Sequence, residues 1–154
     1  MEKVINKKQY DLENRTLRFA KQVRDFIKQL PKNSASFEDG KQVIRSSGSI
    51  GANYIEANEA LGKKDFLMRI RIARKEAKET RYWLQLLETG DNSVLTKTRL
   101  ELIQEATELM MILSAIMRKS DPSLWFIFYY LSFVSNFDIR ISCLSNLWNT
   151  SFTY

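Results

Sequence analysis

The sequence predicts an all-α protein, an antiparallel up-down four-helix bundle followed by an aromatic-rich C-terminal extension. Three observations predict this fold. Apolar residues recur at alternating spacings of four and three over most of residues 11–118, which is typical of amphipathic helices that share a core. Only 5 Gly and 2 Pro occur among 154 residues, which is few for a loop-rich protein. Short breaks separate four periodic segments, and short connections favour antiparallel neighbours.

The first helix is expected at residues 11–30. Its apolar stripe is Leu12, Thr16, Phe19, Val23, Phe26 and Leu30. Pro31 follows at once and ends the helix, because the residue before a proline is disfavoured in helical backbone. Ser36 with Asp39 then resembles an N-cap signal, so a second helix is expected from there to about residue 60.

The third helix is expected to begin near Asp65, after the break at Gly62. Its stripe is Phe66, Ile70, Ala73, Ala77, Thr80, Leu84 and Leu87, and the small residues in its middle let a neighbouring helix approach closely. Gly90, Asp91 and Asn92 predict a turn. The fourth helix is expected at residues 96–118, and its stripe is Leu102, Ala106, Leu109, Leu113 and Ile116.

The stretch RSSGSIGAN at residues 45–53 is the densest in glycine and serine, which raises the question of a phosphate-binding loop. It follows no strand and lacks the Gly-Lys-Ser/Thr ending of a P-loop. The apolar rhythm of Val43, Ser47, Ile50, Tyr54, Ala57 and Leu61 runs straight through it. Two glycines in one helical turn destabilise the helix, unless a close contact offsets the cost. We therefore predict helix packing here.

The composition argues against most enzyme classes. The chain has no histidine, so the commonest general base and metal ligand is missing, and the single cysteine has no histidine to activate it. No zinc-binding spacing occurs. We expect no catalytic residue, no metal and no cofactor. One cysteine and an N-terminus without an apolar segment fit a cytoplasmic protein.

The chain resembles the family of 23S rRNA intervening-sequence proteins over about residues 12–118. The segment from Gln42 to Leu87 carries the residues on which this resemblance rests. The central motif is carried by Ser49, Ile50, Ala52, Asn53 and Glu56. The following helix matches at Phe66, Ile70, Ala73, Glu76, Ala77 and Leu84. The family is similar in fold to the accessory variability determinant proteins of diversity-generating retroelements. The resemblance implies a four-helix bundle, a homopentamer and a non-enzymatic role near RNA or DNA, with a reverse transcriptase as a further partner.

Asn53 and Glu56 lie three residues apart on the second helix, and buried polar groups need partners. Arg74 or Arg81 on the third helix is the expected partner. Two interpretations stay open: a polar clamp that sets the packing register of the helices, which we favour, and a ligand site.

The net charge is +6, with a pI near 9.5, and the excess comes from the first and third helices. The candidate nucleic-acid-binding residues are Lys21, Arg24, Lys28, Arg71, Arg74, Lys75, Lys78 and Arg81. Phosphate contacts add through counterion release, so repetition of these faces in an oligomer favours nucleic-acid binding. Pairing of Lys75 with Glu79 on one helix face would weaken that argument. The alternative is a protein-interaction scaffold or accessory subunit whose basic faces keep it soluble.

Tyr82 and Trp83 lie off the main apolar stripe of the third helix. Either they flank the core, or they form a subunit contact, since Tyr and Trp are enriched at interfaces. We favour the contact because the resemblance implies an oligomer.

The composition changes after Pro122, so we divide the chain into a bundle at residues 1–120 and an extension at residues 121–154. The extension holds 10 of the 18 aromatic residues. Its apolar run, residues 124–134, is too short to span a membrane. Three interpretations stay open: a membrane-surface or partner-docking segment, a segment that folds back on the bundle or fills the centre of an oligomer, and a poorly selected extension. We favour the last.

Overall fold

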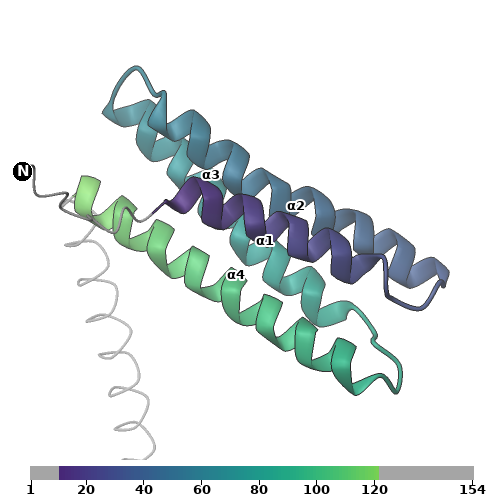
Figure 1. Ribbon diagram of the computed structural model, residues 1–154. Coiled ribbons are helices and arrows are strands. Elements are labelled where there is room, and N and C mark those ends of the chain that lie inside the picture. Colours follow the sequence, from purple (N-terminus) through teal and green to yellow (C-terminus); the bar gives the residue numbers. More distant parts are fainter. Residues whose placement is uncertain (1–10, 122–154) are drawn as a thin grey trace, which may run out of the picture. The chain divides into compact units, whose positions relative to one another are not determined.

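The structure is a computed structural model that describes residues 11–121. It contains four α helices, α1 (Leu12–Ile27), α2 (Ser34–Asn58), α3 (Lys63–Leu86) and α4 (Ser93–Ser120), and no strand within those residues (Figure 1). The predicted all-α bundle is confirmed. The chain divides into two units at residues 117 and 118; residues 11–117 of the first and residues 118–121 of the second are described. The predicted extension lies outside the described residues except for Asp121.

Helix α2 packs against both of its neighbours in the sequence, α1 and α3. The contact between α2 and α3 is the most extensive, and the contact between α1 and α2 is next. Helix α1 is joined to α4 by Arg15, which forms ion pairs with Glu105 and Glu108 of α4. Figure 1 shows α1 in front of α3, with α2 on one side of it and α4 on the other. Helices α1 and α3 are therefore diagonal to each other in the bundle.

The helix starts are set by local side-chain caps. Asp11 accepts a hydrogen bond from the Asn14 backbone N–H at 3.0 Å and begins α1. Asn33 accepts from the Ser36 N–H at 2.7 Å and begins α2. The prediction that Ser36 is the N-cap is wrong, because Asn33 already satisfies its N–H, and Ser36 is buried in the first turn.

The turn between α3 and α4 follows the prediction. Gly90 adopts a φ of 58°, in the left-handed region that glycine tolerates best. Asn92 accepts from the backbone N–H groups of Val94 and Leu95 at 3.0 Å each. Helix α4 therefore begins at Ser93, three residues earlier than expected, because the capping side chain of Asn92 lies in the turn itself.

The predicted stripes form the core, with drift at their ends. Every stripe residue of the first helix is buried, although α1 itself ends at Ile27 and Leu30 follows in a turn. Leu61 was expected on the stripe of the second helix but is fully exposed, because α2 ends at Asn58. In α3 Leu67 is buried in place of Phe66. A spacing of 3.5 residues drifts against a helical turn of 3.6, so stripe ends rotate away from the core.

The glycine- and serine-rich stretch of α2 is helical throughout and touches both neighbouring helices. A Cβ added at Gly51 would lie 2.9 Å from Thr16 Oγ1 of α1. On the other side, Thr80 Oγ1 of α3 donates to Ser46 Oγ at 2.8 Å, and both hydroxyls are buried. The predicted role in helix packing is confirmed, since Gly51 leaves room for α1 and Ser46 forms a hydrogen bond with α3.

We predict that Gly51→Ala lowers the free energy of unfolding by about 1 kcal/mol, because overpacking against buried Thr16 outweighs the better helix propensity of alanine. Gly48→Ala is the matched control. Its Cβ would meet only Arg24 Nη2 at 3.8 Å, so it should raise stability by up to about 1 kcal/mol. Urea unfolding measures both variants. Equal stabilisation by the two substitutions would contradict the close contact between α1 and α2.

Candidate nucleic-acid interface

The outer face of α3 carries a line of exposed cations. Arg71, Lys75 and Lys78, called the basic stripe below, are all exposed, and Ala73 and Ala77 are buried on the opposite face. None of the three forms an ion pair within residues 11–121. Their charges are therefore available to solvent and to an anionic ligand.

The expected pairing of Lys75 with Glu79 does not occur. Glu79 instead accepts a hydrogen bond from the indole Nε1 of Trp83, at 3.2 Å. Burial raises the pKa of neighbouring Glu76, and the charge of Glu79 raises it further, while Arg45 and Lys75 oppose the shift. Glu79 thus bonds to Trp83 and Glu76 is partly buried, and neither carboxylate forms an ion pair with the stripe.

Arg74 and Arg81 lie at the edges of the same helix and are half-buried. They flank the basic stripe rather than belonging to it. The cations predicted on the first helix lie elsewhere: Lys21, Arg24 and Lys28 are exposed on α1, and Lys28 forms an ion pair with Asp25 at 2.9 Å. Because α1 and α3 are diagonal, a single chain presents two separate basic surfaces.

The motif residues of α2 have structural contacts of different kinds. Ile50 is fully buried, Ser49 is half-buried and Ala52 is exposed. Asn53 donates its Nδ2–H to the Ser49 carbonyl of its own helix at 2.9 Å. Four of the five motif residues are therefore not fully buried, and only Ile50 belongs to the core.

Glu56 forms an ion pair across the helices with Arg69 of α3, which also lies 3.9 Å from Asp65. The prediction that Arg74 or Arg81 is the partner is wrong, because Glu56 lies near the end of α2 and meets the beginning of α3. The Glu56 side chain is 52% exposed, so the prediction of a buried group is also wrong. The contact joins α2 to α3 at the surface.

Tyr82 and Trp83 differ in their surroundings. Tyr82 is 55% exposed, whereas Trp83 is half-buried and is held by Glu79. Their ring centroids lie 5.3 Å apart with the planes at 73°, an edge-to-face contact. Trp83 therefore supports the exposed ring of Tyr82, which lies after Lys78 at the end of the basic stripe.

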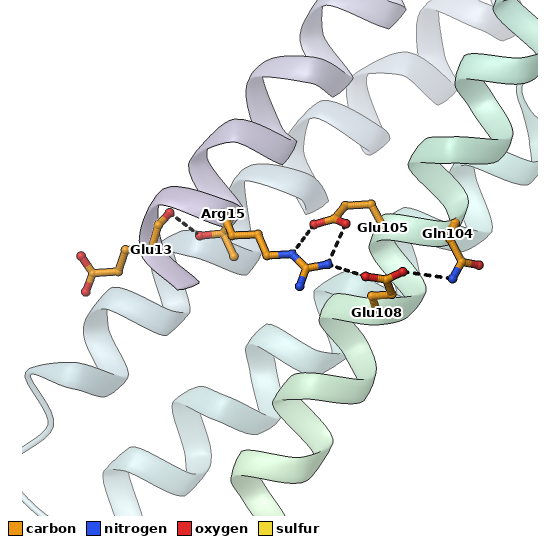
Figure 2. Close-up of polar contacts among 6 residues, drawn as sticks. Glu13, Arg15, Gln104, Glu105 and Glu108 are labelled. Carbon is orange, nitrogen blue, oxygen red and sulfur yellow. Dashed lines mark hydrogen bonds and ion pairs between the residues drawn. The ribbon is translucent and has the colours of Figure 1, made fainter. Parts of the chain in front are cut away.

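A second charged cluster joins α1 to α4 and was not predicted. Arg15 donates from Nε to Glu105 at 2.6 Å and from Nη2 to both Glu105 and Glu108, at 2.8 and 2.6 Å (Figure 2). Gln104 also donates to Glu108, at 3.2 Å. No local sequence signal marked this cluster, because its members lie 90 and 93 residues apart.

No group of three or more potential metal ligands occurs within residues 11–121. Among the helices of that same region, none is long and apolar enough to cross a membrane.

Comparisons with known proteins agree with the fold. The family model described as 23S rRNA-intervening sequence protein matches residues 8–115. A crystal structure from Bacteroides thetaiotaomicron, described as a protein with unknown function from the S23 ribosomal protein family, is 34% identical. The match covers 70% of this chain and 98% of that chain, with a TM-score of 0.61. No curated protein matches the chain.

The Arg15 cluster generates a prediction about pH. The hydrogen bond from Arg15, and then that from Gln104, lower the pKa of Glu108 below its ordinary 4.5. Its contribution to stability is therefore full above that value and is lost as pH falls through the lowered pKa. The stability difference between the wild type and Arg15→Met should shrink between about pH 7 and about pH 3. Urea unfolding at both values measures it, with Lys21→Met as the control. A stability difference that does not change with pH would contradict the conclusion that the contact with Arg15 lowers the pKa of Glu108.

Proposed function

The chain belongs to the 23S rRNA-intervening sequence protein family, and from this premise we propose that it is a non-enzymatic protein that binds RNA or other nucleic acid. The observation that carries the proposal is the basic stripe of α3. Its three cations are exposed, and none forms an ion pair within the described residues.

The distribution of ion pairs supports this assignment. Arg15 and Arg69 lie between helices, and both are neutralised by carboxylates of another helix. The stripe has no such structural partner, so phosphate groups can approach it without displacing a contact that holds the bundle together. Each phosphate contact releases condensed counterions, and the resulting affinity is strong at low salt and independent of sequence.

We propose a homo-oligomer, a pentamer by the family resemblance, as the form that binds. A single chain presents its α1 and α3 cations on separate surfaces, with a short stripe on each. Several copies would repeat the stripe around a ring and so add phosphate contacts. The non-enzymatic assignment is supported by the absence of histidine from all 154 residues.

A second candidate function is a protein-interaction scaffold or an accessory subunit, for example of a reverse transcriptase. It is favoured by large apolar side chains on the surface of the described bundle. Leu61 is 103% exposed, Val94 70% and Phe37 63%. A partner protein would remove this apolar area from water.

The test is binding of fluorescently labelled RNA and DNA across a salt series, with the protein's mass measured in solution alongside. In the triple variant Arg71→Glu, Lys75→Glu, Lys78→Glu, affinity should fall more than tenfold, and the slope of log affinity against log salt should drop by about 2. A pentamer should have a mass of about 90 kDa, five times 18.1 kDa.

The matched control carries the same charge change at three scattered exposed lysines, Lys32→Glu, Lys63→Glu and Lys97→Glu. It should retain most of the affinity, because its sites do not form a line. Equal losses in the two triple variants would mean that net charge alone drives binding. Absence of binding by the folded wild type at low salt would overturn the proposal in favour of the scaffold.

A further inference from the structure

We infer that the basic stripe and Tyr82 form one site for single-stranded nucleic acid, in which phosphates follow the stripe and a base stacks on the tyrosine ring. This inference rests on the proposed function and names the class of ligand. Tyr82 is 55% exposed and lies outside the core, so its ring is accessible to a ligand.

The four side chains lie on one line along α3. Arg71, Lys75, Lys78 and Tyr82 follow one another at spacings of four, three and four residues, which places them on the same helix face. At a rise of about 1.5 Å per residue, the line is roughly 16 Å long. It is one side chain wide, so it can follow one sugar-phosphate backbone.

The tyrosine ring is held in position and remains accessible. Trp83 contacts it edge-to-face at 73°, and Glu79 in turn fixes the indole through Nε1. With 55% of Tyr82 exposed, ring surface is left for a base. Lys78 lies one helical turn before the ring, where it can bind the phosphate next to the stacked base.

The chemistry favours an unpaired base. In a duplex each internal base is already stacked on both faces, so Tyr82 gains nothing there and only phosphate contacts remain. A single strand offers both phosphates and free base faces, and stacking on aromatic side chains tolerates any sequence. The ligand is therefore expected to be single-stranded and of relaxed sequence.

The test compares Tyr82→Ala, Tyr82→Phe and the control Leu86→Ala, which removes a 45% exposed apolar side chain one turn away. The probes are a labelled oligouridine strand of about 12 nucleotides and a blunt RNA duplex of the same length. Tyr82→Ala should weaken single-strand binding by about 5- to 50-fold and duplex binding by less than about twofold. Tyr82→Phe and Leu86→Ala should bind both probes as the wild type does.

The outcomes separate this inference from the proposed function. If neither probe binds the wild type at low salt, the proposed function fails, and this inference fails with it. If both probes bind and Tyr82→Ala weakens them equally or not at all, only the stacking inference is overturned. The mass in solution tests the other interpretation, in which Tyr82 is a subunit contact. A smaller assembly for Tyr82→Ala, but not for Leu86→Ala, would support that contact and overturn the stacking of a base on Tyr82.

Discussion

The close approach of α2 to both of its neighbours is the constraint on which the rest of the bundle depends. At Gly51 the missing side chain leaves room for the Thr16 hydroxyl, where a Cβ would lie at 2.9 Å. Five residues earlier, buried Ser46 accepts a hydrogen bond from Thr80. Thr16 of α1 and Thr80 of α3 therefore face α2, and the exposed cations of α1 and α3 are directed to solvent.

Two groups of cations in the described chain differ in their surroundings. Arg15 and Arg69 lie where helices meet, and they bind carboxylates across the boundary. The basic stripe of α3 lies where no other helix of the bundle reaches it. Phosphate can approach these cations without breaking an ion pair of the bundle, and the proposed function therefore rests on this stripe. The same geometry leaves Tyr82 outside the core, at the end of the stripe.

Much of the fold followed from local patterns. The four helices, their core faces and the turn at Gly90 were predictable, because period and turn chemistry are local properties of the chain. Helix boundaries were less predictable. Ser36 resembled a cap, but Asn33 precedes it and satisfies its N–H. Leu61 continued the apolar rhythm after the helix had ended, so it lies exposed. In both cases a neighbouring side chain or helix end overrode a correct local signal.

The sequence by itself determined most of the residues that face the core and most of those that carry charge to the surface, because a helix repeats every 3.6 residues wherever it packs. The tertiary structure alone decided which charges meet. Glu56 pairs with Arg69 rather than Arg74 or Arg81, because antiparallel helices joined by a short loop bring the end of one beside the beginning of the next. Arg15 finds Glu105 across 90 residues because α1 and α4 are neighbours. The two basic faces are separate surfaces because α1 and α3 are diagonal, and helix adjacency is a property of the whole bundle.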